Sequence, residues 1–504
     1  MFLNNNKILR TGMATLIFWI IVQPLYSQCI GIVVVTKWLF LSYFIILGFT
    51  IFIFINLKKY YKDKYRVEYE NKLKIKEKLF FNKNMPETGQ TTIYGGKRHH
   101  KYKKVTVLFA DIQGFTRIVE HMNPELLIDE LDRFFFHFDE VVEKYGIEKI
   151  KTIGDAYMCA GGLPQKNRTN PVEVVMAAIE MQHYMKRARH KIKDTGNELD
   201  FWELRIGIHT GPVISGVIGQ KKLSFDIWGD TVNIASRMES SGVAGEINIT
   251  GVTYHLTKEF FTHEYRGKMP IKYKGETDMY FVKGIKPELS DEGKGEKPNE
   301  MFFIKLQHIR YNDIEEFVLN KLESELPANM FYHNINHTKD VITRVDVLGR
   351  AENVSEEELL LLKTAALLHD VGFIISYINH EDNSINFAKE LLPKYKYSKN
   401  QIKEIVKLID ATRVDFKPKT LTEKIIKDAD LDYLGRPDFV PISENLFKEI
   451  INNGVRLSIE EWNKMQYEFI SNHTLYTDSA KKLRQVDKEG QLQKLKELVF
   501  EYEV

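Results

Sequence analysis

VTVLFADIQGFT, at residues 105–116, is the stretch that decides the fold of the central part of this chain. Its first five residues are apolar or β-branched, which predicts a buried β-strand, and Asp111 lies where this apolar run ends. A second apolar run, residues 147–153, leads through a glycine to Asp155. Each aspartate alone would also suit a turn. Together, two carboxylates at neighbouring strand ends predict a site for hard divalent cations, which bind oxygen ligands and assist phosphoryl transfer.

A third segment, FDIWGDTVNIASRME at residues 225–239, places polar groups at a helical spacing. Asn233 and Arg237 are four residues apart, so a helix here would project both from one face. An arginine suits phosphate recognition because its guanidinium stays charged and can contact two oxygens at once. The three segments, in this order, resemble the catalytic domain of class III nucleotidyl cyclases, an α+β fold with a ferredoxin-like core.

The resemblance implies a role for each of these polar groups. Asp111 and Asp155 would bind two Mg²⁺ or Mn²⁺ ions, with the carbonyl of Ile112 as a further ligand. Asn233 would orient the ribose. Arg237 would neutralise the charge that develops at the α-phosphate.

Two further segments are expected to contact the polyphosphate. Residues 113–116 form a turn at a predicted helix start, and its backbone N–H groups, including those of Phe115 and Thr116, suit phosphate oxygens. By resemblance, the triphosphate-binding lysine is Lys274, or Lys272 in an alternative register of IKYKGETDMYFV.

The choice of base follows from hydrogen-bond polarity. Lys151 can only donate, and an ionised Asp226 can only accept, which matches adenine and mismatches guanine. The pair predicts an adenylate cyclase that converts ATP into cyclic AMP and pyrophosphate, with relaxed ATP/GTP specificity as the alternative. In the family the site lies between two catalytic domains, so a chain with the full set of groups is expected to form a head-to-tail homodimer with two equivalent sites.

The N-terminal region predicts attachment to a cell membrane. Residues 38–57 are uncharged and apolar over the length of a transmembrane helix. The basic residues at 58–66 then place the following region in the cytoplasm. Residues 13–35 are interpreted as a first transmembrane helix, with a signal peptide as the alternative. The net charge of +2 carries no nucleic-acid signature, so no nucleic-acid partner is expected.

Composition divides the 504 residues into several units. The expected boundaries are a membrane region at 1–57, a juxtamembrane helix and linker at 58–95, the cyclase domain at 96–288, a linker at 289–300 and a helical domain at 301–504. Residues 60–82 predict a helix, either a short coiled coil or a solvated spacer. Cys29 and Cys159, the only cysteines, are too few for a disulfide framework, and Cys159 is expected in the cyclase core.

The C-terminal region is rich in helical patterns, such as residues 356–368 and 400–412. His369 and Asp370 close the first of these, His337 lies upstream, and Asp430 lies downstream. Imidazoles and carboxylates together can bind a divalent metal and activate water for attack on phosphorus. This order of residues resembles the HD superfamily of metal-dependent phosphohydrolases.

The HD resemblance implies one divalent metal of unknown identity, bound by His337, His369, Asp370 and Asp430. Alignment favours Asp430 over Asp428 as the last ligand, and His333 and His380 are accessory candidates. IDATR, at residues 409–413, stands where a second metal would need a histidine, so one ion is expected rather than two.

Two classes of function remain open for the whole chain. One is a bifunctional enzyme, a cyclase joined to a phosphohydrolase of unknown substrate. The other is a membrane cyclase whose HD-like domain is a non-catalytic regulatory or ligand-binding module.

Overall fold

The computed structural model describes residues 91–94, 97–115, 119–120, 122–193, 202–218, 224–271 and 275–500. The expected membrane segments, the helix at 60–82, Cys29, Thr116, Lys272 and Lys274 therefore lie outside the described residues. Within the ranges given above, no helix is both long and apolar enough to cross a bilayer. The described residues belong to one compact unit, Glu87–Val504.

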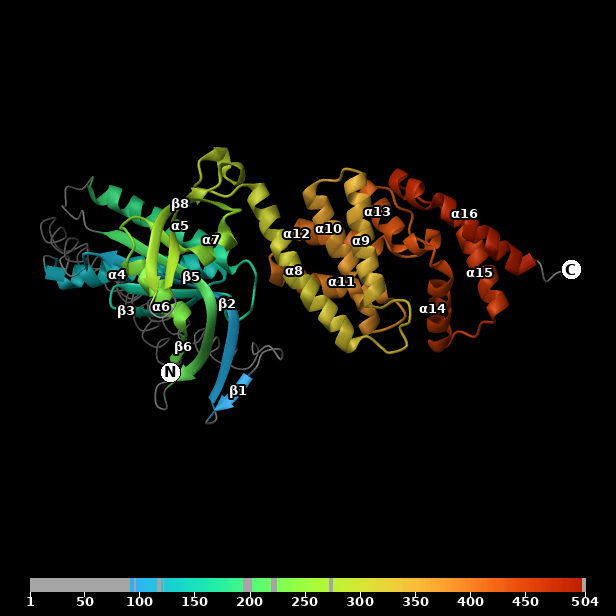
Figure 1. The fold of residues 1–504 in the computed structure, drawn as a ribbon, viewed down its shortest axis with the longest axis horizontal. Helices are drawn as coiled ribbons and strands as arrows, with labels where there is room; N and C mark the ends of the chain where they lie inside the picture. The colour runs from blue at the N-terminus through green and yellow to red at the C-terminus, as the bar shows by residue number, and fades with distance from the viewer. Residues whose placement is uncertain are drawn as a thin grey trace, which may run out of the picture. The chain divides into compact units, whose positions relative to one another are not determined.

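A mixed nine-stranded sheet forms the first part of this unit (Figure 1). Its path runs β3-β4-β2-β5-β7-β9-β8, with β1 paired to β2 and β6 paired to β5. The strands are β1 (Thr91–Tyr94), β2 (Lys97–Gln113), β3 (Glu148–Ile153), β4 (Ala156–Gly161), β5 (Glu203–Ile218), β6 (Ser224–Trp228), β7 (Ile247–Thr250), β8 (Phe261–Ile271) and β9 (Gly275–Ile285).

A βαββαβ unit lies at the centre of this sheet. It comprises β2, helix α4 (Pro124–Tyr145), β3, β4, helix α5 (Asn170–Lys193) and β5. These strands stand in the order β5-β2-β4-β3, with every neighbouring pair antiparallel. This is the ferredoxin-like arrangement expected from the sequence, and the α+β class is confirmed.

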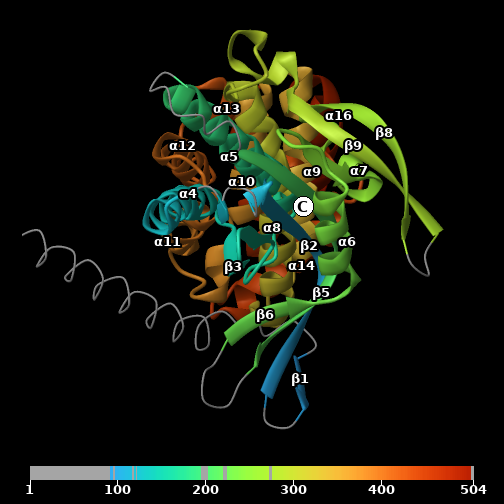
Figure 2. The ribbon, with the colours of Figure 1, turned by 90° about the vertical axis from the view of Figure 1, so that its left-hand side faces the viewer.

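Successive side chains of β2 point to opposite faces of the sheet, and each face has its own hydrophobic cluster. Leu108, Ala110 and Ile112 face a core completed by α4 and α5, while Val107 and Phe109 face a smaller cluster on the other side. Because successive side chains of a strand point to opposite faces, one apolar run serves both layers. Figure 2 shows α4 and α5 beside the sheet.

The structure corrects the expected end of this strand. β2 continues past Asp111 to Gln113, because β5 goes on pairing with it through Ile112↔Leu204 and Gln113↔Glu203. Asp111 therefore projects from within a paired strand, where backbone hydrogen bonds hold its position.

Helix α6 (Asp230–Ser240) packs on β5 and is followed, after β7, by α7 (Gly251–Thr257). A Cβ atom on Gly207 of β5 would lie 1.9 Å from the backbone nitrogen of Glu239, so this close approach requires glycine. The expected linker is compact: it contains a short 3₁₀ helix, η2 (Asp291–Gly293), and the N–H of Ile285 donates to the carbonyl of Gly295.

The remainder of the described chain is helical, as expected. Its α-helices are α8 (Glu300–Glu325), α9 (Ile335–Ala351), α10 (Glu356–Leu368), α11 (His380–Leu391), α12 (Lys399–Asp410), α13 (Leu421–Asp430), α14 (Phe439–Asn452), α15 (Ile459–Asn472) and α16 (Asp478–Phe500). Short 3₁₀ helices include η3 (Val371–Ile374), η4 (Leu392–Tyr395) and η5 (Asp432–Gly435). One apolar core joins α8 through α13, and a second lies among η5, α14, α15 and α16.

Candidate active sites

The two cyclase carboxylates lie on adjoining strands of the sheet. Asp111 projects from β2, and Asp155 follows Gly154 in the tight turn between β3 and β4. Gly154 has a φ of +63°, a conformation that glycine adopts without strain. Burial and the nearby Asp111 carboxylate raise the pKa of Asp155. Two carboxylates that repel one another in this way favour a bound cation between them.

Arg205 is a residue of this site that sequence reasoning missed. It stands opposite Asp111 on β5, and its Nη2 lies 3.1 Å from an oxygen of that carboxylate. Its Nε donates to Glu239 of α6 at 2.7 Å. Burial raises the pKa of Glu239, while Arg205 opposes the shift. The guanidinium therefore links the strand that carries Asp111 to the helix that carries Asn233 and Arg237.

Lys151 and Asp226 are brought together by the fold. The Nζ of Lys151, on β3, donates to the Oδ2 of Asp226, on β6, at 2.6 Å. The Asp226 carboxylate also accepts the backbone N–H of Ile227 at 2.9 Å, which orients it. One side chain that only donates and one that only accepts thus stand side by side.

Asn233 and Arg237 lie on α6, as the helical spacing predicted. Both are exposed, on the side of the helix opposite the buried Ile234, Ala235 and Met238. Among the described residues neither side chain has a hydrogen-bond or ion-pair partner.

The remaining phosphate-contacting candidates are only partly described. The buried side chain of Ile112 is a hydrocarbon without a ligand atom, so only its carbonyl could bind a metal. The half-buried side chain of Phe115 packs against the hydrophobic core between the sheet and helices α4 and α5. Thr116 and Lys274 lie outside the described residues.

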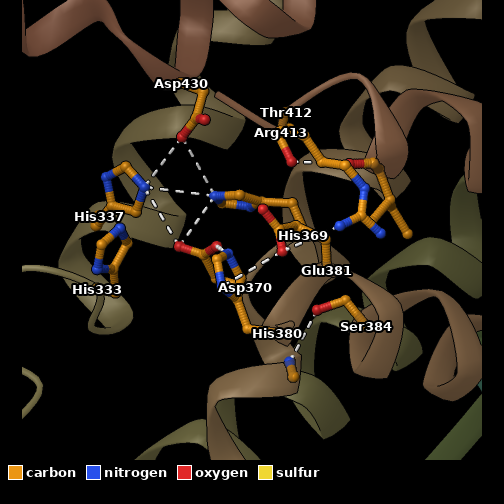
Figure 3. Close-up of polar contacts among 12 residues, drawn as sticks. His333, His337, His369, Asp370, His380, Glu381, Ser384, Thr412, Arg413 and Asp430 are labelled. Atoms are coloured by element: carbon orange, nitrogen blue, oxygen red, sulfur yellow. Dashed lines mark hydrogen bonds and ion pairs between the residues drawn. The ribbon is translucent and has the colours of Figure 1, made fainter. Parts of the chain in front are cut away.

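The four predicted HD residues lie close together (Figure 3), and three of them, His337, His369 and Asp430, offer ligand atoms that all lie within 4.8 Å of one another. The Nε2 atoms of His337 and His369 are 3.3 Å apart. Asp370 Oδ2 lies 3.4 Å and 3.1 Å from them, and Asp430 Oδ1 lies 3.2 Å and 3.4 Å from them. Ligand atoms about 2.1 Å from a shared ion lie roughly 3.0 to 3.4 Å apart in octahedral or tetrahedral geometry. The spacing of His337, His369 and Asp430 therefore fits one metal ion, and Asp370 lies directly beside this group.

The surroundings of the cluster also fit a metal. His369 Nδ1 lies 2.8 Å from the carbonyl of Ala366, which can only accept, so Nε2 is left with its lone pair toward the cluster. The Oδ2 atom of Asp370 is buried and has no hydrogen-bond partner among the described residues. Burial disfavours the charged form of His369, but the Asp370 and Asp430 carboxylates outweigh it and raise the pKa of this imidazole. The cluster thus favours a positive charge.

Asp428 is held away from the metal cluster. Its carboxylate accepts the backbone N–H groups of Tyr476 and Thr477 and the Thr477 hydroxyl, at 2.7 to 3.2 Å. The structure therefore brings Asp430, and not Asp428, to the cluster.

In the segment where a second metal would need a histidine, the polar side chains are engaged with other partners. The Thr412 hydroxyl donates to the carbonyl of Ile409 at 2.7 Å. Arg413 pairs with Asp410 and Asp382. His380 lies 3.6 Å from Asp370, on the side facing away from His337 and His369 (Figure 3).

His333 and Glu449 form a buried pair beside the cluster. His333 Nδ1 lies 2.5 Å from a carboxylate oxygen of Glu449, on α14. The same carboxylate accepts the backbone N–H groups of Tyr332 and His333. Burial lowers the pKa of His333, but the hydrogen bond to Glu449 and the nearby carboxylates raise it overall. Sequence reasoning missed Glu449, because nothing local marks a lone glutamate on a helix 116 residues away.

A cavity of about 150 Å³ opens next to the metal cluster. His337 and Asp430 form part of its wall, so a molecule bound there would touch the metal cluster. Tyr332, Tyr433, Asn445 and Arg436 also line it.

Comparison with known proteins agrees with this division of the chain. Residues 98–284 match the family of adenylate and guanylate cyclase catalytic domains, and residues 334–432 match the HD domain. The chain therefore contains a class III cyclase catalytic domain followed by an HD domain. The HD match ends before Glu449.

Individual relatives match the cyclase part. An adenylate cyclase of Mycobacterium tuberculosis (strain ATCC 25618 / H37Rv) is 38% identical over 187 residues, 37% of this chain and 41% of that protein. Guanylyl cyclase C of Homo sapiens is 36% identical over 191 residues, 37% of this chain and 17% of that protein. The guanylate cyclase domain of RhGC from Catenaria anguillulae, solved with GTP, is 33% identical and covers 37% of this chain and 99% of that chain, with a TM-score of 0.34. The chain thus spans less than half the length of these two curated relatives, which include both nucleotide classes.

Proposed function

We propose that the cyclase domain converts ATP into cyclic AMP and pyrophosphate at two equivalent sites of a head-to-tail homodimer. The observation that carries the proposal is the Lys151–Asp226 pair, in which a donor stands 2.6 Å from an acceptor in a chain that also has both carboxylates. N1 of adenine accepts and its amino group donates, so adenine can replace the contact between the two side chains.

The other groups of the site have complementary roles. A divalent ion held by Asp111 and Asp155 would supply Lewis acidity at the ribose hydroxyl and the triphosphate. Arg205 keeps Asp111 in place. Asn233 orients the ribose and Arg237 offsets charge at the α-phosphate, both from the partner protomer. Two protomers are needed because each contributes half of a site.

The test compares wild-type protein with Asp111→Asn and Asp155→Asn under Mg²⁺ and Mn²⁺, with ATP and GTP. Loss of a metal-ligating carboxylate should lower cyclic AMP formation by orders of magnitude. Glu180→Gln, which removes a surface carboxylate of α5, is the matched control and should leave the rate unchanged. Near-normal rates in both aspartate variants would overturn the metal assignment.

For the HD domain, we propose hydrolysis of a phosphate ester or nucleotide at a single-metal site. The carrying observation is the group of His337, His369 and Asp430, whose facing atoms lie 3.2 to 3.4 Å apart, with Asp370 Oδ2 3.1 Å from His369 Nε2. An ion bound by this cluster would supply activated water. Glu449 favours the protonated form of His333, so this imidazole is our candidate to donate a proton to the leaving oxygen. A regulatory module that binds a ligand without hydrolysing it is the second candidate, and the cavity at His337 and Asp430 would suit either.

The HD proposal is tested in an Asp155→Asn chain, where the cyclase cannot consume nucleotide. Metal analysis and a screen of nucleotides, cyclic nucleotides and simple phosphate esters are expected to show about one bound ion and hydrolysis. Both should disappear in the added His369→Ala variant. A chain with no metal and no hydrolysis under any divalent ion would favour the regulatory module.

We also propose, from the sequence, that residues 38–57 anchor the protein in a membrane with its catalytic domains in the cytoplasm. The support is the uncharged apolar run and the basic residues that follow it. A topology reporter fused after Arg66 should be active on the cytoplasmic side. Activity confined to the opposite side would refute this orientation.

A further inference from the structure

Helix α8 belongs to two hydrophobic cores at once. Near its start, Phe302 and Leu306 are buried in the core of the sheet, and the Phe302 ring packs edge-on against Phe260 at 5.2 Å. The following turns instead enter the core of the HD region, through Tyr311, Ile314, Val318 and Leu322. Because protein cores are close-packed, this helix cannot shift in one core without disturbing the other.

A buried carboxylate forms ion pairs between the cyclase domain and the helical HD region. Glu173, on α5 of the cyclase domain, has a side chain only 5% exposed. It accepts from Arg310 of α8 at 3.0 Å and from Lys396, which follows η4 of the HD domain, at 3.1 Å. Removing one partner of a buried ion pair leaves a charge uncompensated, which is costly. We call Glu173, Arg310 and Lys396 the clamp.

The clamp touches elements that lead to both sites. The ammonium of Lys396 also donates to the carbonyl of Tyr145, at 3.0 Å, where α4 ends. The next strand, β3, carries Lys151 and runs into the turn with Asp155. On the other side, α8 packs against α10 and η3, which flank His369 and Asp370. One contiguous set of packed elements therefore connects the base-recognition strand to the metal cluster.

We propose that α8 and the clamp couple the two sites, so that metal occupancy of the HD site changes the rate of the cyclase. This inference rests on the functions proposed for the two domains. His337 on α9, His369 at the end of α10 and Asp430 on α13 would hold the ion together, so binding would constrain these three helices, and α8 packs against the first two of them. A shift of α8 would move Arg310 and the other clamp residues. Through the bond from Lys396 to the Tyr145 carbonyl, it would also shift the end of α4 and the strand β3 that follows. The part of the coupling that acts on ATP affinity is reciprocal, so bound ATP changes the metal affinity of the HD site by the same factor.

A double-mutant cycle on the full-length chain tests the coupling. Asp430→Asn removes an HD ligand, and Glu173→Gln breaks the clamp while keeping the shape of the side chain. With the clamp intact, Asp430→Asn should change cyclase kcat/KM by roughly 5-fold or more, a usual size for allosteric coupling. In the Glu173→Gln background the same substitution should change it by less than about 2-fold. An equal change in both backgrounds, or none in either, would overturn the proposal.

Two variants keep the result interpretable. Glu264→Gln, on β8, removes an exposed carboxylate whose partner, Lys283, also lies in the cyclase domain, so it should preserve the full response. Lys396→Met breaks the clamp from a half-exposed position and should abolish the response even if Glu173→Gln folds poorly. A full response in folded Lys396→Met would contradict the clamp.

Metal analysis of nucleotide-free protein separates the two ways of failing. An Asp430→Asn chain that keeps its metal contradicts the HD site, and with it the coupling that rests on that site. A chain that loses the metal while its cyclase rate stays the same contradicts the coupling alone.

Discussion

Lys151 and Asp226 are 75 residues apart in the sequence, yet their side chains form one recognition pair. Exchanging their polarity tests whether they choose the base. In Lys151→Glu with Asp226→Cys, an acceptor faces the ring N–H of guanine and the acceptor that suits adenine's amino group is lost. We expect the ratio of GTP to ATP turnover to rise, even if total activity falls. The measurement is kcat/KM for each nucleotide. An unchanged ratio would show that this pair does not recognise the base.

His473 predicts a pH dependence of folding. Burial, together with Lys488 and Lys427, lowers its pKa to about 4, whereas an unfolded chain would have the ordinary value near 6.5. The unfolded state therefore binds more protons between these values, so stability is lost as the pH falls from about 6.5 toward 4.

Replacing this imidazole tests the effect. His473→Phe keeps a ring against Phe469 but cannot titrate. The loss of Tm between pH 7 and pH 4.5 should be smaller in the variant than in the wild type. Parallel Tm curves across this range would show that His473 does not contribute.

At the scale of elements, the helix that presents His369 and Asp370 has a complete capping box. The N–H of Glu358 donates to the Ser355 hydroxyl, and the N–H of Ser355 donates to the Glu358 carboxylate. Ser355→Ala should destabilise the HD domain by about 1 kcal/mol, the usual cost of a lost N-cap. Denaturant unfolding measures this.

Metal binding should survive the same substitution, because the ligands lie at the other end of α10. Ser398→Ala, which removes the equivalent capping box of α12, is the matched control with a similar cost. Loss of metal from folded Ser355→Ala protein would show that the cap also positions the ligands.

For the whole molecule, the shared-site proposal makes a prediction about mixed dimers. Asp155→Ala and Asn233→Ala remove groups from opposite halves of a site, so each variant alone should be almost inactive. A mixed dimer carries both defects in one site and leaves the other site intact. Mixing should therefore restore up to about half of the wild-type activity per mixed dimer. No recovery, in dimers shown to exchange subunits, would place each site within a single chain.

The sequence alone was sufficient to predict the two domains and several of the side chains that the fold brings together at each candidate site. Its signals are local: the apolar run before Asp111, the tight turn before Asp155, the four-residue spacing of Asn233 and Arg237, and the adjacent His369 and Asp370. Each depends on strand and helix periods within one segment, so it could be interpreted without knowing the rest of the chain.

Only the tertiary structure decided which distant groups support those sites. Arg205 reaches Asp111 across 94 residues, Glu449 reaches His333 across 116, and Lys396 reaches Glu173 across 223. The sequence of α8 likewise did not reveal that its two ends serve different cores. Charged side chains on helices and strands look alike until packing buries them, and a buried charge needs a partner that the fold alone selects.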